Sequence, residues 1–318
     1  MNTPKIRTTT CGIYPKLIES EGVPHLKRSL HRFDEGQISS EELEEVIQKN
    51  IRAALEEMRE AGVTVFNDAL VRWTDFFAPF SQSFSGISPG TLKRIFDTNT
   101  LQRKPKISGK ISWAENNATK DFTYAHSLLQ EGEEIKASIP GPFTFADASD
   151  NEFYENKTEL LSDLSEALNR QILEYEKSGA DFIEVYDPVL AFSIYPNAKE
   201  TYETLLQGVS KPVILGSFYG TVRDENLKLL ESLLSGFSLD LVSKENLPRL
   251  EKAEVVQVGI FDARNTLEDD IQSCQDKLNS VTKAFPNART LLALNNSPEF
   301  LPRKNAREKI SALSSLVV

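Results

Sequence analysis

The chain alternates eight times between a short apolar run of β-forming residues and a longer helical run. Several of the short runs are apolar almost throughout, as expected of strands buried on both faces of a parallel sheet. Such an alternation predicts a parallel sheet wrapped by helices. The expected strands are Ile6–Thr10, Val63–Asn67, Glu134–Ile139, Asp181–Tyr186, Pro212–Ser217, Phe237–Val242, Val255–Ile260 and Thr290–Leu294.

Polar residues mark the starts of several helices. Ser39 followed by Glu42 forms a capping box that opens an expected helix over Glu41–Ala61. Asp224 and Thr266 are the expected N-caps of two later helices.

Eight strand–helix units in series favour an α/β fold of the closed (βα)8 TIM-barrel type over an open sheet. The 318 residues suit one such barrel, and no low-complexity linker divides them, so residues 1–318 are expected to form a single domain. Lys106–Trp113 is a ninth strand-like segment. It predicts an insertion with an extra strand around residues 97–117. Cys274 lies on the apolar stripe of a helix and is expected in the core.

The net charge of −11 argues against a nucleic acid or an anionic membrane as partner, because both select basic surfaces. No apolar run approaches the roughly 20 residues that cross a bilayer, and Met1–Thr10 lacks the apolar core of a signal peptide. Two cysteines cannot build a disulfide framework. A cytoplasmic protein is therefore expected.

Chemistry in a barrel of this kind takes place at the carboxyl ends of the strands. Trp73 lies just beyond the second expected strand, where it either stacks on a ring-shaped ligand or is buried by its own helix. The side chains expected to line a pocket at these ends are Cys11, Asp68, Thr144, Asp187, Tyr219, Asp262, Arg264 and Asn296.

The sequence predicts no metal site. Zinc needs three or four convergent cysteine, histidine or carboxylate ligands. His25, His31 and His126 fall in expected helices away from the strand ends, and Cys11 alone is well placed. The same absence of a strand-end histidine leaves no nucleophilic triad.

Basic residues gather in two places, Lys16, Lys27 and Arg28 after the first strand and Arg103 and Lys104 in the insertion. They form either a solvated face or a rim that binds a carboxylate or phosphate tail.

Several segments resemble cobalamin-independent methionine synthase, and above all its N-terminal half. They occur in the family's order over nearly the whole chain. The segments are Thr8–Lys16, His25–Leu30, Glu35–Ser39, Phe96–Asn99 followed by a basic run, Gly141–Phe145, Gly179–Leu190, Leu239–Val242 and Gly259–Asn265.

The resemblance implies a known chemistry. Full-length members have two barrels face to face and transfer a methyl group from a methyltetrahydrofolate polyglutamate to homocysteine. The C-terminal barrel holds zinc through a His-x-Cys pair after strand five, a Glu after strand six and a Cys after strand eight. The corresponding residues here are Gly216 and Phe218, Val242, and Asn296 or Ser297, none of which ligates zinc in that way.

The N-terminal barrel of the family helps to bind the folate and its anionic tail. Lys27 falls where that half uses a basic residue against the polyglutamate, and Asn99 belongs to a second matching segment. A neighbouring family arginine is Pro24 here, which implies a weaker or altered tail site. The family's acidic pair after strand four is replaced by Tyr186 and Asp187.

The leading hypothesis is therefore an N-terminal-type subunit of a split methionine synthase. It would bind a methylated tetrahydropterin and carry no cofactor of its own, while a separately encoded barrel holds zinc and homocysteine. One alternative is a self-sufficient methyltransferase or a uroporphyrinogen-decarboxylase-like enzyme that uses Asp187, or Asp262 with Arg264. The other is a pterin-binding module without catalytic activity.

Overall fold

Eight parallel strands close into a barrel. The computed structural model describes residues 6–16, 22–94, 101–218, 220–243, 247–248 and 253–317. The strands are hydrogen-bonded in the order β1-β11-β10-β9-β8-β7-β5-β2, and a parallel bridge between Thr9 and Val65 joins the first strand to the last. Their bounds are β1 Ile6–Thr8, β2 Val65–Phe66, β5 Glu134–Pro140, β7 Phe182–Tyr186, β8 Val213–Gly216, β9 Gly236–Asp240, β10 Val255–Phe261 and β11 Arg289–Leu294. The predicted strands and the (βα)8 fold are confirmed.

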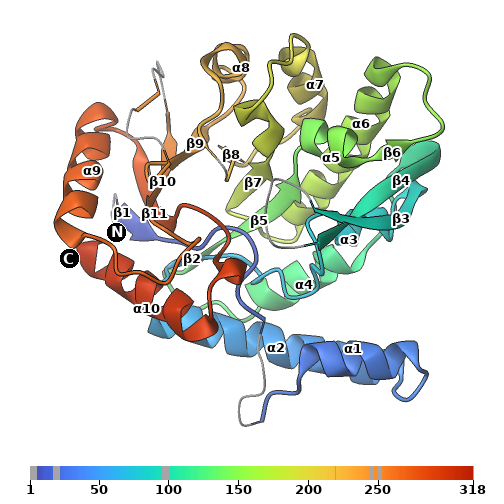
Figure 1. Ribbon diagram of the computed structural model, residues 1–318, viewed down its shortest axis with the longest axis horizontal. Helices are drawn as coiled ribbons and strands as arrows, with labels where there is room; N and C mark the ends of the chain where they lie inside the picture. Colours follow the sequence, from blue (N-terminus) through green and yellow to red (C-terminus); the bar gives the residue numbers. More distant parts are fainter. Residues whose placement is uncertain are drawn as a thin grey trace.

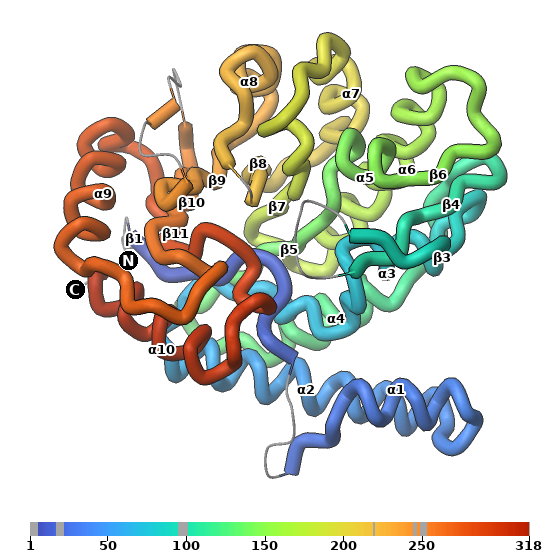
Figure 2. The backbone as a smooth tube through the Cα atoms, viewed as in Figure 1, coloured from blue at the N-terminus to red at the C-terminus, as the bar shows by residue number. Residues whose placement is uncertain are grey.

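Helices surround the strands (Figure 1), and the backbone winds once around them from α2 through α6 and α8 to α10 (Figure 2). No helix in the described ranges is long and apolar enough to span a membrane. The helices are α1 Leu26–Asp34, α2 Ser40–Glu60, α3 Ala78–Ser81, α4 Asn117–His126, α5 Pro142–Ala148, α6 Lys157–Lys177, α7 Ala198–Leu205, α8 Asp224–Leu230, α9 Ile271–Ala284 and α10 Arg303–Ser314, with short 3-10 turns η1 Pro188–Ala191, η2 Pro298–Phe300 and η3 Ser315–Val317.

The predicted capping box of α2 is confirmed. The Glu42 backbone N–H donates to Ser39 Oγ at 3.2 Å, and the Ser39 N–H donates to the Glu42 carboxylate at 2.7 Å. Two helix beginnings differ from the prediction. Asp270, not Thr266, caps α9, because its carboxylate accepts the N–H groups of the first turn. Asp224 is the first residue of α8 rather than its cap, and there its charge offsets the helix dipole.

The insertion is larger than predicted. β3 (Ser85–Arg94) and β4 (Leu101–Ser112) form an antiparallel hairpin, and β6 (Asp150–Asn151) pairs with β4. The prediction of one extra strand around residues 97–117 missed β3. That strand contains Gly86, Pro89 and Gly90, which are residues typical of loops, and its pairing with β4 shifts register there.

A buried polar network lies inside the barrel. Lys136 of β5 and Glu184 of β7 form an ion pair at 2.7 Å with both side chains fully buried. Gln257 of β10 accepts from Lys136 at 2.6 Å and donates to Glu184 at 2.7 Å and to Ser238 at 3.0 Å. The charges are compensated in place, which a buried ion pair requires.

Candidate functional site

A pocket opens at the carboxyl ends of the barrel strands, where the fold predicts one. Its empty space totals about 420 Å³, but the side chains are so close that only about 20 Å³ admits the centre of a water molecule. The residues that line this mouth pocket are Gly12, Ile13, Leu70, Trp73, Phe76, Gln102, Tyr186, Pro188, Phe218, Ser297 and Glu299.

Four aromatic rings dominate the mouth pocket. Tyr186 stacks on Phe218 with ring centroids 4.1 Å apart, and Phe76 meets both rings at 6.2 and 6.3 Å. Trp73 contacts Phe76 edge to face at 6.3 Å. Trp73 is buried and lines the pocket, but it lies in the loop before α3, so the helix expected to bury it is wrong; its stacking on a ligand stays a prediction. Such walls suit a flat, apolar ligand face.

Tyr186 is held in place by two glycines. Its hydroxyl accepts the Gly12 backbone N–H at 2.7 Å, and burial raises the pKa of the phenol well above its usual value. A Cβ at position 216 would lie 2.8 Å from the Tyr186 ring, so Gly216 leaves the space that the ring fills. A larger side chain at 216, such as a metal-binding histidine, would have to displace Tyr186.

Cys11 lies at the mouth of the barrel, but its side chain is not placed to bind a metal ion. Its Sγ lies 3.0 Å from the Leu294 carbonyl oxygen and 3.1 Å from that of Asn296, and burial raises the pKa of the thiol strongly. A neutral thiol with backbone acceptors is a poor metal ligand. The side chain of Asn296 accepts the Ser297 N–H at 2.7 Å.

The described residues do not fit zinc. Within them, no three cysteine, histidine or carboxylate side chains come close enough together to hold a metal ion. The histidines lie on helices or at their ends, away from the strand ends, as the sequence predicts. His25 is the N-cap of α1, His31 of α1 pairs with the C-cap residue Glu35, and His126 is the last residue of α4.

Three pocket residues were missed by the sequence prediction, the aromatic Phe76 and the polar residues Gln102 and Glu299. Gln102 of β4 is buried, and among the described residues its side-chain oxygen has no hydrogen-bond partner. Burial raises the pKa of Glu299 to about 7, against the opposing charge of Lys16. Glu299 follows the last expected strand by only a few residues, and this position could have indicated that it lies near the strand ends. Gln102 lies in the insertion, where no comparable feature of the sequence indicates a pocket residue.

Asp187 and Thr144 are joined by hydrogen bonds that stabilise the structure. The carboxylate of Asp187 is fully buried and accepts from the Thr144 N–H at 2.7 Å, the Thr144 hydroxyl at 2.6 Å and the Tyr202 hydroxyl at 3.0 Å. Burial raises its pKa to about 6, while these donors pull in the opposite direction. Through its hydrogen bonds with Thr144, Asp187 ties the segment after β5 to the end of β7.

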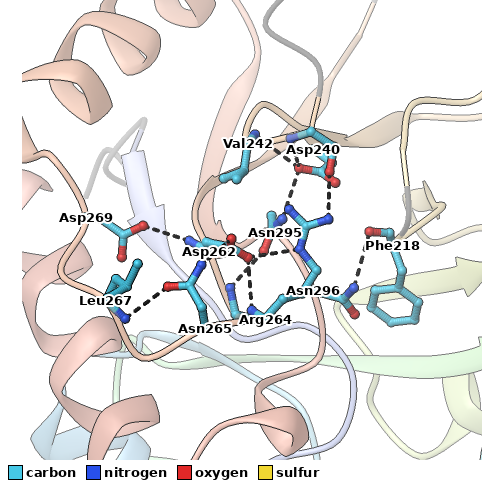
Figure 3. A network of polar contacts seen from close by, with 12 residues as sticks. Phe218, Asp240, Val242, Asp262, Arg264, Asn265, Leu267, Asp269, Asn295 and Asn296 are labelled. Carbon is cyan, nitrogen blue, oxygen red and sulfur yellow. Dashed lines mark hydrogen bonds and ion pairs between the residues drawn. The ribbon is translucent and has the colours of Figure 1, made fainter. Parts of the chain in front are cut away.

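Asp262 and Arg264 form a separate network beyond β10 (Figure 3). Asp262 accepts from the Arg264 Nε at 3.0 Å and from Asn265 at 2.7 Å, while Arg264 also donates to Ser243 at 3.0 Å. Neither residue lines the mouth pocket. The pair braces the loop, and Arg264 remains partly exposed.

Asp68 lies just after β2 and is buried. Desolvation, helped by the nearby charge of Asp121, raises its pKa to about 7. The next residues, Ala69 and Leu70, have left-handed φ angles of 58° and 50°. Asn67 steadies this turn by accepting the Ala69 N–H at 2.9 Å.

The predicted basic residues lie on different elements. Lys27 and Arg28 are exposed on α1, which lies along α2 (Figure 1), whereas Arg103 and Lys104 belong to β4. The Lys16 ammonium donates to the Trp73 carbonyl oxygen at 2.9 Å. Asn99 and Tyr219 lie outside the described residues.

A second hollow, with an empty space of about 680 Å³, lies beside the hairpin. It is lined in part by Lys104 and by two basic residues of β3, Lys93 and Arg94, which the sequence prediction missed along with their strand. Lys104 forms an ion pair with Asp150.

Solved structures share this fold. A B12-independent methionine synthase from Shewanella sp. W3-18-1, determined in complex with selenomethionine, superposes with a TM-score of 0.79 at 20% identity, covering 98% of this chain and 96% of that one. A putative vitamin-B12 independent methionine synthase from Listeria monocytogenes gives a TM-score of 0.72 at 15% identity, with 98% of each chain covered.

Relatives in sequence have nearly the same length. The methionine synthase of Saccharolobus solfataricus is 25% identical over 317 residues, which is 98% of this chain and 93% of the relative. That of Sulfurisphaera tokodaii is also 25% identical, over 96% of this chain and 90% of the relative.

A family model gives the assignment. The model for the N-terminal domain of cobalamin-independent synthase matches residues 84–286, which is more than half of the chain. The resemblance predicted from the sequence is therefore confirmed, and with it the class of enzyme, a methyltransferase of the cobalamin-independent methionine synthase type. The chain belongs to the cobalamin-independent synthase family, whose N-terminal domain it matches.

Proposed function

We propose that this chain binds a methylated tetrahydropterin at the mouth of its barrel and presents the methyl group to homocysteine on a separate, zinc-bearing barrel. The observation that carries the proposal is the mouth pocket, which combines four aromatic rings with a set of residues that does not fit zinc. A flat pterin suits aromatic walls, whereas a thiol acceptor would lack the metal that the family uses to hold it.

The chain's own contribution would be positioning. Trp73, Phe76 and the Tyr186–Phe218 pair offer ring faces that orient the donor and exclude water. Methyl transfer breaks a carbon–nitrogen bond in the donor as the carbon–sulfur bond of methionine forms. The proton that the homocysteine thiol gives up balances the one that the leaving nitrogen takes up. Fixing the geometry of two reactants accounts for a large part of such a barrier and needs no strong acid or base from this barrel.

An anionic tail on the donor would lie in the hollow beside the hairpin. Lys93, Arg94 and Lys104 contribute positive charge there, on a protein whose net charge is −11. Carboxylates of a glutamyl tail would compete with Asp150 for Lys104. Lys16, Lys27, Arg28, Asn99 and Arg103 remain proposed tail contacts from the sequence.

The test is an assay of methionine formation from homocysteine and a methylated tetrahydropterin. The purified chain is assayed alone, with an added zinc-bearing barrel, and the zinc-bearing barrel is assayed alone. We expect activity that depends on both proteins. Full activity from this chain by itself would overturn the split arrangement.

A second candidate, a self-sufficient methyltransferase, has one observation in its favour. The chain covers 93% of the length of a relative that bears the name methionine synthase, so proteins of about this size carry that name. If Asp262 and Arg264 were catalytic, Asp262→Asn would abolish activity of the chain alone. Binding of the pterin with no effect on the zinc-bearing barrel would instead favour a binding module.

A further inference from the structure

Two hydrogen-bond acceptors line the mouth pocket among its aromatic rings. We infer that Gln102 and Glu299 form a polar edge that recognises the N–H groups along one side of a planar heteroaromatic ring. The inference rests on the proposed function, in which that ring is the pterin of the donor, and it names the residues that select it. The matching side of a pterin is its pyrimidine edge, where a ring N–H and an amino group both donate.

Gln102 is the stronger indication of a ligand. It lies on β4 opposite Lys93, and its side chain is 7% exposed. Its oxygen has no partner among the described residues. Leaving a buried acceptor unsatisfied costs about 1–3 kcal/mol, so native proteins normally supply a donor. The space open to a water molecule, about 20 Å³, holds one water or one donor group of a ligand.

Glu299 provides the second acceptor from a different element, the turn η2 that follows β11. The charged groups that act on it are Lys16, which favours the carboxylate, and Asp75, which opposes it. With its pKa near 7, a large fraction of Glu299 is ionised at neutral pH and able to accept two N–H groups.

The rest of the pocket limits what the ligand can be. Trp73, Phe76, Tyr186 and Phe218 face a ring, and none of them donates a hydrogen bond to Gln102 in the structure. A purely apolar ligand would leave the acceptor of Gln102 buried and unpaired, and a ring edge of acceptors would face two further acceptors. A flat ring with donors on one edge satisfies both features of the pocket.

The experiment measures ring binding through Trp73 fluorescence. Trp113, the other tryptophan, is first replaced by phenylalanine so that the signal comes from the pocket. The probes are 6-methylpterin, which has no tail, and its analogue with hydrogen in place of the 2-amino group. Gln102→Leu and Glu299→Gln are titrated with both. The matched controls are Gln207→Leu and Glu254→Gln, whose side chains lie outside the mouth pocket.

We expect each pocket variant to bind 6-methylpterin about tenfold more weakly, which corresponds to one lost hydrogen bond. At least one of the two variants should bind the analogue as the parent does, because the analogue lacks the amino group that the replaced acceptor would receive. The controls should bind both probes normally.

Three results would overturn the inference. Unchanged 6-methylpterin binding in both variants would remove the two acceptors from recognition, and the proposed function would stand. An equal loss for both probes in both variants would indicate general damage to the pocket in place of an edge contact. Failure of the parent chain to bind 6-methylpterin would overturn the inference together with the donor binding in the proposed function.

Discussion

The ring of Tyr186 lies against the ring of Phe218, with centroids 4.1 Å apart and planes 22° apart. Tyr186 ends β7, whereas Phe218 follows the end of the adjacent strand β8 by two residues and has a left-handed φ of 52°. The stack lies over the glycine at position 216, where the family's catalytic barrel is expected to carry a histidine. The aromatic pair thus fills the region in which a metal ligand would project.

Substitution Gly216→Ala should destabilise the protein. The Cβ of the new alanine would lie 2.8 Å from the Tyr186 ring, which is closer than side chains tolerate. The ring is held in place by the hydrogen bond that its hydroxyl accepts from the Gly12 N–H. Overpacking of this kind costs about 1–3 kcal/mol in the free energy of unfolding. Urea denaturation measures the loss. Gly109→Ala is the control, because its Cβ would be 3.5 Å from the nearest atom; an equal loss in both variants would contradict the steric explanation.

The sequence was sufficient for the barrel because its strands are buried on both faces. Val255–Ile260 and Thr290–Leu294 are apolar runs that no surface element would have, and they lie within a residue of β10 and β11. β3 could not be predicted, because Pro89 and the glycines of this strand are typical of loops, and only its pairing with β4 makes it a strand.

The polar edge of the pocket could not be predicted from the sequence, for a different reason. Gln102 is a strand residue in an insertion, and only the fold brings it to the same pocket as Glu299. Asp187 is a related case. A carboxylate at a strand end suggests a functional role, which stays a prediction, but its hydrogen bonds with Thr144 and Tyr202 could not be foreseen from the sequence. Burial and partner groups are tertiary properties, and a one-dimensional pattern does not contain them.

Removing the buried cation, Lys136→Met, should be strongly destabilising. Glu184 would be left charged inside the barrel without its ion pair at 2.7 Å. Breaking one side of a buried pair costs about 3–5 kcal/mol. The double variant Lys136→Met with Glu184→Gln should recover most of this free energy, because no charge remains. Urea denaturation of both variants measures their free energies of unfolding. A double variant as unstable as the single one would contradict the explanation by an unpaired buried charge.

Asp68→Asn should stabilise the protein in a pH-dependent way. The pKa of Asp68 is about 7 in the folded chain and lower in the unfolded chain, so ionisation favours unfolding as the pH rises from about 4 to 7. Asparagine removes that penalty. The gain over the parent should be negligible near pH 4, grow up to pH 7 and stay constant above it, reaching a few kcal/mol at most. Urea denaturation at pH 4.5 and 8 measures it. A gain that is larger at pH 4.5 would contradict the sign.

Phe76→Ala should speed up ring binding. Of the four aromatic residues in the mouth pocket, Phe76 alone is only partly buried, and it contacts both Tyr186 and Phe218 from its place on the pocket wall. Because only about 20 Å³ of the pocket admits the centre of a water molecule, a ring does not fit until a side chain moves, and the least buried one moves at the lowest cost. Stopped-flow fluorescence of Trp73 with 6-methylpterin should show an association rate raised by about tenfold, equivalent to 1.4 kcal/mol of barrier.

The cost of the same substitution in unfolding free energy should be about 2 kcal/mol, below that of a fully buried phenylalanine. Phe153→Ala, which removes a 50% exposed ring outside the pocket, should change neither quantity appreciably. If Phe76→Ala left the association rate at the parent value while Trp73 still reported binding, the ligand would have to enter past a different side chain. Leu70 and Pro188, the remaining large apolar residues nearest the strand ends on the pocket wall, would then be the positions to replace.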